Sequence, residues 1–317
     1  PRRCSTWPTG TSPHIRPVSA SWSTAEPLSG WVLSELRASI LSRVGAELGE
    51  GPLWRSETAE VLWVDVLRGE VHALDLGGND RLVATLGEPV GAIALDNDGR
   101  VLAATPRGLK DLDGRLVASI PLEAEDLRMN DGKPDPFGRF VGGTMTLDQP
   151  REGAGSLWSL DGSGSTRLVS GVTISNGLAW NAIGTELYWI DTPTGRVDVF
   201  DYDAATGSAV NRRTFVEIPA DAGSPDGMCI DSEGGLWVAL WGGGAVRRYE
   251  AGELTAIVDV PTPLVTCPTF AGDRLDMLVV TTASVDFEAP PRGGGDIYAA
   301  EIGVSGTEPH RLGEWAT

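Results

Sequence analysis

Oxygen-bearing side chains recur at one position of a short repeated motif, in which a polar residue precedes a glycine and an apolar stretch. Two of them are carboxylates, Glu50 and Asp226, and two are amides, Asn130 and Asn176. Carboxylate and amide oxygens with no neighbouring His or thiol pair suit a hard divalent ion such as Ca²⁺, Mg²⁺ or Mn²⁺. Converging carboxylates also repel one another unless a cation neutralises them. These residue types therefore indicate an oxygen-rich metal site, provided that the copies of the motif meet in space.

Each of these residues has a simpler explanation when it is taken alone. Asn-Gly and Asp-Gly are the commonest dipeptides of tight turns, so any single copy is equally well explained as a turn former. The argument for chemistry is their shared position in the repeat. The elements that carry the repeat must therefore bring that position to one point.

The repeat itself predicts the elements that position these side chains. A polar turn followed by an alternating apolar strand starts at residues 55, 96, 135, 181, 231 and 272, at intervals of 39 to 50 residues. Each unit holds about four short strands, which is typical of a propeller blade. The sequence predicts an all-β, six-bladed propeller with four-stranded blades around a central channel. A strand near residues 42–48 is expected to close the ring by pairing with C-terminal strands, and the loop entering each first strand should face the axis.

The N-terminal region differs from the repeats. Residues 1–38 are rich in Pro, Ser, Thr and Trp and show no sustained strand or helix period, apart from weak helical character at Leu33 to Leu41. We therefore expect two regions. Residues 1–38 form a disordered or non-native leader, and residues 39–317 form the propeller domain.

Composition excludes several classes of partner. The 25 Lys and Arg stand against 44 Asp and Glu, a net charge of −19, which repels nucleic acids and anionic membrane surfaces. No apolar run is long enough to span a membrane, and no secretory signal is evident. Three cysteines are too few for a disulfide framework and favour a reducing compartment. We expect a cytoplasmic protein with a small-molecule partner, as a monomer or weak oligomer.

Five motifs together resemble the regucalcin and gluconolactonase family of sugar-lactone hydrolases, over about residues 40 to 315. They are Leu48-Gly49-Glu50-Gly51-Pro52-Leu53-Trp54, Arg128-Met129-Asn130-Asp131-Gly132-Lys133, Gly143-Thr144-Met145, Ile174-Ser175-Asn176-Gly177-Leu178-Ala179-Trp180 and Ser224-Pro225-Asp226-Gly227-Met228.

The resemblance implies one catalytic divalent ion in a six-bladed propeller, with Ca²⁺ the leading candidate and Mg²⁺, Mn²⁺ and Zn²⁺ the alternatives. The ligands it implies are Glu50, Asn176 and Asp226. It also implies substrate contacts from Arg128 and Asn130. Asp148 stands where the family often has a Glu, three residues after the Gly-Thr-Met motif, which leaves the sugar undefined.

The chemistry that follows is metal-dependent opening of a sugar lactone to the aldonic acid. The ion would act as a Lewis acid on the lactone carbonyl, and Asp226 would be both ligand and general base. Arg128 and Asn130 would bind sugar hydroxyls or the developing oxyanion. Two alternatives remain open: a calcium- or ligand-binding propeller without turnover, and a related metal-dependent hydrolase of aryl esters or organophosphates.

Overall fold

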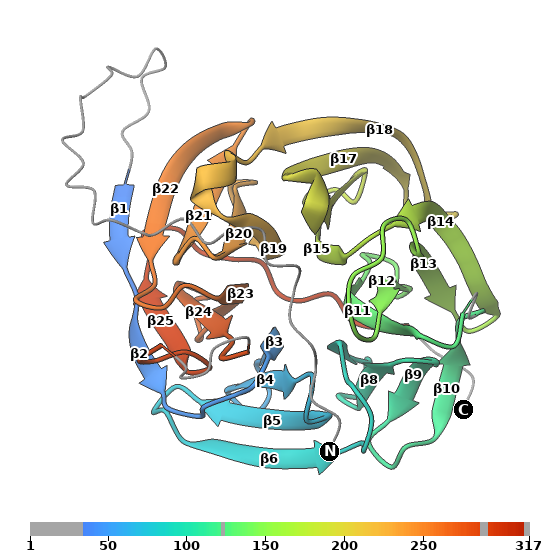
Figure 1. Cartoon of the computed structure of the whole chain (residues 1–317), viewed down its shortest axis with the longest axis horizontal. Coiled ribbons are helices and arrows are strands. Elements are labelled where there is room, and N and C mark those ends of the chain that lie inside the picture. The colour runs from blue at the N-terminus through green and yellow to red at the C-terminus, as the bar shows by residue number, and fades with distance from the viewer. Residues whose placement is uncertain (1–33, 122–123, 286–290, 314–317) are drawn as a thin grey trace.

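The fold is a ring of six sheets around a central axis. The computed structural model describes residues 34–121, 124–285 and 291–313. These residues form twenty-five strands and two single-turn 3-10 helices, arranged as blades (Figure 1). The inner strand of every blade contacts the inner strands of both neighbouring blades. The predicted all-β, six-bladed propeller is therefore confirmed.

Each blade runs from an inner strand beside the axis to an outer strand at the outside of the ring. In that order, blades one to three contain β3 (Gly49–Arg55), β4 (Glu60–Asp65), β5 (Glu70–Asp75) and β6 (Asp80–Thr85); β7 (Ala92–Leu95), β8 (Val101–Thr105), β9 (Gly108–Asp111) and β10 (Leu116–Ser119); and β11 (Leu127–Pro134), β12 (Phe140–Thr146), β13 (Gly155–Asp161) and β14 (Gly164–Val172). Blades four to six contain β15 (Ser175–Trp180), β16 (Glu186–Asp191), β17 (Arg196–Asp203) and β18 (Ser208–Glu217); β19 (Ser224–Ile230), β20 (Leu236–Trp241), β21 (Ala245–Glu250), β22 (Glu253–Asp259) and β1 (Ser34–Arg37); and β23 (Val265–Ala271), β24 (Met277–Thr282), β25 (Ile297–Glu301) and β2 (Ser39–Ser42). The helices are η1 (Thr192–Thr194) and η2 (Ala220–Ala222). Among the residues that the structure describes, neither helix is long and apolar enough to span a membrane.

One turn chemistry repeats between the first and second strands of four blades. The side chains of Asp96, Asp135, Asn181 and Asp231 each accept two backbone N–H groups of the following turn, at 2.8–3.1 Å. A glycine in each turn has φ between 68° and 90°, a conformation that disfavours other residues. The polar turns expected at these places are confirmed, and they fix the direction of each inner strand.

Tryptophans on the second strands pack between the blades. Trp63, Trp189 and Trp237 are at most 1% exposed. Trp237 of blade five lies edge-on against Phe270 of blade six, with ring centroids 6.2 Å apart. Such aromatic contacts bury large apolar areas and hold neighbouring sheets at a fixed distance.

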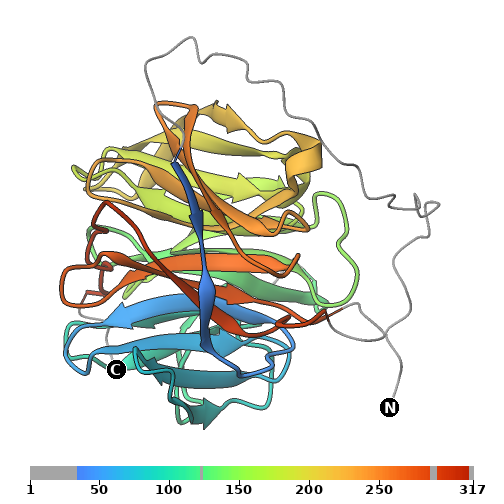
Figure 2. The same cartoon turned by 90° about the vertical axis from the view of Figure 1, so that its left-hand side faces the viewer.

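The segment before blade one joins blades five and six. β1 pairs in parallel with β22, and β2 pairs antiparallel with β25, along one edge of the ring (Figure 2). Ring closure by a strand before blade one is confirmed, although the strand lies at Ser39–Ser42, ahead of residues 42–48. Two expectations are wrong: residues 34–38 belong to the sheets rather than to a leader, and the segment expected to be weakly helical is extended. The backbone hydrogen bonds of this segment are made with β22 and β25, which lie more than 200 residues away in the sequence, so the local sequence pattern could not reveal the pairing. Residues 1–33 of the expected leader lie outside the described residues.

Removing residues 1–42 is expected to lower the melting temperature by about 5 °C or more compared with removing residues 1–33. The shorter chain would lose β1 and β2 and leave the outer edges of β22 and β25 unpaired. Thermal unfolding followed by circular dichroism compares the two proteins. Equal melting temperatures would show that the closure contributes no stability.

Candidate active site

Bulges in the inner strands aim the candidate residues at the axis. The pairing of an inner strand with its neighbour shifts register just after Glu50, Met129, Asn176 and Pro225. A bulge of this kind bends a strand and redirects side chains next to it. The four candidate oxygen donors lie within the first four residues of their inner strands, at or next to these shifts: Glu50, Asn130, Asn176 and Asp226. The expectation that these side chains sit in the loops before those strands is wrong, but their convergence is not affected.

A cavity of about 670 Å³ at one end of the axis collects the candidate residues. Six side chains proposed from the sequence line it together: Glu50, Arg128, Asn130, Asp148, Asn176 and Asp226. They come from four blades: the inner strands β3, β11, β15 and β19 of blades one, three, four and five each contribute at least one of them. Asp148 follows β12 of blade three. The radial arrangement thus brings residues more than 170 positions apart in the sequence to one point.

Glu50 and Asp226 are two carboxylates of the cavity, of which Asp226 is buried and Glu50 is half-buried. Burial, followed by the charge of Asp131, raises the pKa of Glu50 to about 8. Burial, followed by the charge of Glu50, raises the pKa of Asp226 well above its usual value. The raised pKa values show that ionising both carboxylates is unfavourable without a neighbouring positive charge, which a divalent cation bound by both would supply.

A chain of hydrogen bonds fixes the amide of Asn176. Arg128 Nη1 donates to Asn130 Oδ1 at 2.7 Å, and Asn130 Nδ2 donates to Asn176 Oδ1 at 2.9 Å. Asn176 Nδ2 in turn donates to Thr192 Oγ1 at 2.8 Å, and that hydroxyl donates to the Pro225 carbonyl, also at 2.8 Å. The amide nitrogen is thereby turned toward Thr192, and Oδ1 keeps a second lone pair for an ion. This orientation suits Asn176 as an oxygen ligand.

Arg128 is a buried cation beside the carboxylates, 5% exposed. Burial lowers its pKa to about 10, and the charge of Glu50 opposes that shift. Arg128 is therefore still charged at neutral pH. Its Nε is buried and has no hydrogen-bond partner among the described residues, and the residue lines the cavity, where other N–H groups of the guanidinium can face a substrate oxygen.

Asp148 has a looser relation to the others. It lines the same cavity but is an exposed residue of the loop that follows β12. Its position at the cavity rim places it over the substrate space rather than among the buried oxygen donors.

The donor set fits a hard divalent ion. Its members are two carboxylates, Glu50 and Asp226, and the oriented amide of Asn176. Across residues 34–121, 124–285 and 291–313, no three His, Cys, Asp or Glu side chains gather as a metal-binding group. Any ion on these residues would therefore depend on the amide oxygen and on water, a set that Ca²⁺ and Mg²⁺ accept.

Sequence reasoning missed Thr192, which positions Asn176. A signal was present, because Trp63-Val64-Asp65 and Trp189-Ile190-Asp191 repeat at the ends of β4 and β16. The aspartate of each copy accepts backbone N–H groups of the segment that enters its own blade's inner strand. Thr192 follows the second copy directly.

Replacing Thr192 with valine is expected to weaken divalent-ion binding about tenfold. The valine has the same shape but cannot accept from Asn176 or donate to the Pro225 carbonyl. Titration calorimetry with Ca²⁺ measures the change. Thr194→Val is the matched control, because that hydroxyl of η1 bonds the Asp191 carbonyl instead. Equal weakening in both variants would point to disturbance of η1 rather than loss of Asn176 orientation.

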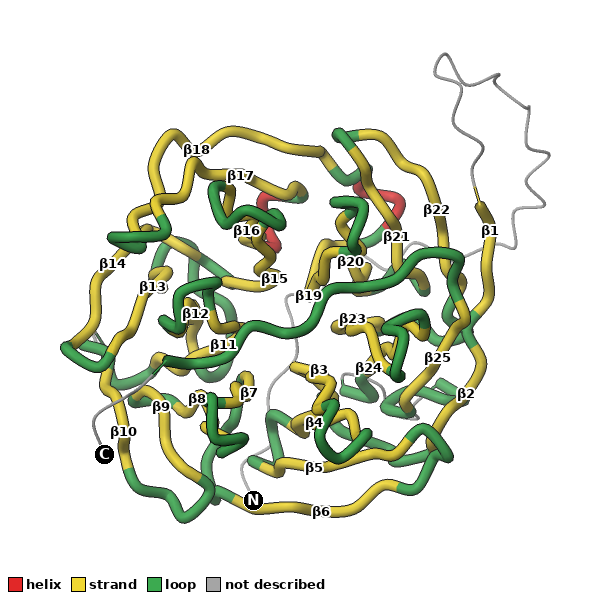
Figure 3. The backbone as a smooth tube through the Cα atoms, turned by 180° about the vertical axis from the view of Figure 1, so that it is seen from behind, coloured by secondary structure: helices red, strands yellow, loops and turns green. Residues whose placement is uncertain are grey.

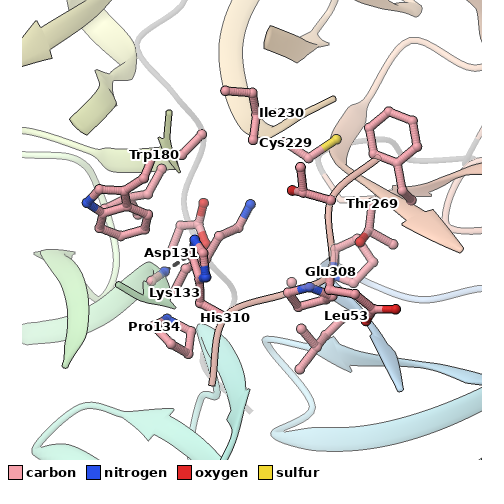
Figure 4. Close-up of a pocket in the computed structure, with 18 of the residues that line it drawn as sticks. Leu53, Asp131, Lys133, Pro134, Trp180, Cys229, Ile230, Thr269, Glu308 and His310 are labelled. Atoms are coloured by element: carbon pink, nitrogen blue, oxygen red, sulfur yellow. Dashed lines mark hydrogen bonds between the residues drawn. The ribbon is translucent and has the colours of Figure 1, made fainter. Parts of the chain in front are cut away.

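A second, smaller cavity of about 90 Å³ is lined by residues further along the same inner strands, and Figure 4 shows its lining. Asp131, Lys133, Cys229 and His310 contribute to its lining. The segment that follows β25 crosses the back of the ring and closes this end of the channel (Figure 3). Asp131 thus faces away from the first cavity, and it acts on Glu50 through its charge alone. Cys267, at the corresponding position of the blade-six inner strand, is fully buried and lines neither cavity.

Known proteins resemble this chain over most of its length. A family model described as the SMP-30/gluconolactonase/LRE-like region matches residues 48–284, which include all six candidate residues. Regucalcin of Xenopus laevis is 34% identical over 280 residues, 83% of this chain and 94% of that protein. Pentonolactonase XacC of Haloferax volcanii is 38% identical over 245 residues, 75% of this chain and 82% of that protein. A solved structure of a calcium-binding protein, regucalcin from Agrobacterium tumefaciens, is similar with a TM-score of 0.80 and 29% identity, covering 89% of this chain and 99% of that one.

Proposed function

Because the chain belongs to the SMP-30/gluconolactonase/LRE-like family, we propose that it is a divalent-metal-dependent lactonase that opens a sugar lactone to the aldonic acid. One observation carries the proposal. The oxygen donors Glu50, Asn176 and Asp226 share a cavity with Arg128, which can donate to the oxygens of a lactone, and with Asn130, whose Oδ1 can accept from a sugar hydroxyl. The relative named pentonolactonase supports the same substrate class.

Glu50, Asn176 and Asp226 would hold the ion. When bound, the ion would supply Lewis acidity toward the lactone carbonyl. Asp226 would accept the proton of the attacking water as that oxygen bonds to the carbonyl carbon. The bond between the carbonyl carbon and the ring oxygen then breaks, and the ring oxygen leaves as a hydroxyl group after taking the proton back from Asp226. The new carboxyl group releases the second proton of the water to solvent. The products are one carboxylate and one hydroxyl on the same molecule.

Arg128 would orient the lactone and steady its developing negative charge. The Nδ2 of Asn130 already donates to the Ser175 carbonyl and to Asn176 Oδ1, so Asn130 would contact the substrate through Oδ1, as an acceptor for a hydroxyl group. Arg128 is 5% exposed and lines the cavity, so a hydrogen bond from its guanidinium to the substrate would form in a low-dielectric setting. Removing a single donor of this kind typically costs about 3 kcal/mol of transition-state stabilisation. The chain through Asn130 to Asn176 would keep the substrate contacts and the ion ligand at a fixed separation.

Chelation is expected to abolish lactone hydrolysis, and re-addition of one divalent ion is expected to restore it. The panel contains gluconolactone and pentonolactones, assayed after EDTA treatment and then with Ca²⁺, Mg²⁺, Mn²⁺ or Zn²⁺ added singly. We expect Ca²⁺ or another hard ion to restore the most activity, because the donor set is all oxygen. Turnover that survives chelation would contradict the proposal.

A second candidate is a calcium-binding propeller without turnover. The observation in its favour is the similarity to proteins named regucalcin, one of them described as calcium-binding. Tight Ca²⁺ binding by calorimetry, together with no hydrolysis across the lactone panel, would support it. The aryl-ester and organophosphate alternative is less favoured, because the relative named for its substrate is a lactonase.

A further inference from the structure

The wall above the oxygen donors is apolar in five of the six blades. In each of these blades the end of the second strand, or the connection after it, brings an apolar side chain to the cavity of about 670 Å³. We call these side chains the apolar rim: Leu67, Leu147, Pro193, Trp241 and Val285.

The apolar rim is unusual for a site that handles only a sugar. Leu67 and Leu147 are 43% and 37% exposed, among the few large apolar side chains that the described residues leave so open. A single exposed leucine needs no explanation, but several apolar side chains around one opening mark a binding surface. A sugar lactone carries hydroxyls on most of its carbons, and a hydroxyl buried against leucine or valine without a partner destabilises the complex.

The size of the cavity indicates the same thing. At about 670 Å³ it is in the range of pockets that hold drug-sized ligands, roughly 300–1,000 Å³. The polar groups Glu50, Arg128 and Asp226 lie on the inner strands, and Asp148 and Gln149 are the exposed polar residues that stand beside the apolar rim. A sugar lactone bound to the inner-strand groups would leave most of the apolar rim in contact with water.

We propose that the preferred substrates are lactones whose ring carries an apolar alkyl or aryl substituent. This inference rests on the proposed lactonase function. The ring would lie on the polar region beside Arg128 and Asp226, and the substituent would lie along Leu67 and Leu147. Each buried methylene group of the substituent should raise kcat/KM about three- to fourfold until the rim is covered. The gain should appear in KM, because the substituent is far from the reacting carbonyl.

The first experiment compares δ-lactones that carry unbranched alkyl chains of increasing length with gluconolactone, in the metal-loaded protein. We expect kcat/KM to rise with chain length and to exceed that for gluconolactone. In Leu67→Asn and Leu147→Asn, we expect the ratio of kcat/KM for a long-chain lactone to that for gluconolactone to fall about tenfold. Leu82→Asn is the matched control, because Leu82 is 52% exposed on the outer strand β6, away from the cavity.

Two outcomes would overturn the inference while leaving the proposed function in place. One is hydrolysis of gluconolactone with no gain from chain length, and the other is an unchanged ratio in both rim variants. Absence of all lactone turnover would instead remove the proposed function. The rim is then tested by calorimetric binding of the matching alkyl δ-lactams, which resist hydrolysis. An affinity that does not rise with chain length would overturn the inference there too.

Discussion

Asp226→Asn is expected to lower kcat by about 10²- to 10⁴-fold on any lactone that the protein hydrolyses, with the fold intact. Asparagine has nearly the same shape, so the packing of β19 should not change. It cannot accept a proton from water, and it leaves Glu50 as the only carboxylate of the ligand set. The loss of a negative charge should also weaken binding of a divalent ion. Steady-state kinetics at saturating metal separate the loss of the base from the loss of the ion.

The thermal stability of the metal-free protein should not fall with kcat in the Asp226→Asn variant. Glu50 and Asp226 raise each other's free energy when both are ionised, so the metal-free variant should melt no lower than the metal-free parent. Asp131→Asn is the matched control, since Asp131 is an equally buried carboxylate of the smaller cavity. We expect a much smaller loss of kcat from it. Equal losses in both variants would show that only the charge near Glu50 matters, and would remove Asp226 as the base.

The repeat in the sequence was sufficient to predict the ring, and it placed Glu50, Asn130, Asn176 and Asp226 at one position of the blades, whereas Arg128 and Asp148 were proposed from the family resemblance alone. Polar turns such as Asp135 and Asp231 mark the same place in successive blades, so residues at one offset from them must share one radius. Glu50, Asn176 and Asp226 could therefore be grouped without any knowledge of contacts. This reasoning works because a propeller converts a sequence period into a rotation about an axis.

Features that depend on pairing between distant segments could not be predicted from the repeat. Ser34 pairs with Ala256 and Ile40 with Tyr298, and nothing in the local pattern of this segment reveals either partner. The bulge beside Asn176 depends equally on the register of β15 against β16. The apolar rim has no period at all, because its members lie at the ends of strands and in loops of different length.

Metal-free protein is expected to lose stability as the pH rises from about 5 to about 8, with a fall in melting temperature of roughly 5 °C. The pKa of Glu50 is raised from its usual 4.5 to about 8 in the folded state, so the folded protein holds a proton that the unfolded chain has released. A raised acid pKa favours the folded state at low pH, and that contribution disappears as the pH passes from the unfolded value to the folded one. The raised pKa of Asp226 acts in the same direction.

A saturating divalent ion should remove this pH dependence, because the ion takes the place of the protons and stabilises the ionised carboxylates. Melting curves from about pH 5 to about pH 8, with EDTA or with Ca²⁺, test this directly. His72 requires a control, because Asp80 and Glu70 raise its pKa against the effect of burial, and its titration lowers stability over part of the same range. Glu50→Gln separates the two groups: it should flatten the profile of the metal-free protein if Glu50 is responsible. A profile that stays equally steep in that variant would assign the pH dependence to His72 or to other groups, and would contradict the charge demand inferred for the site.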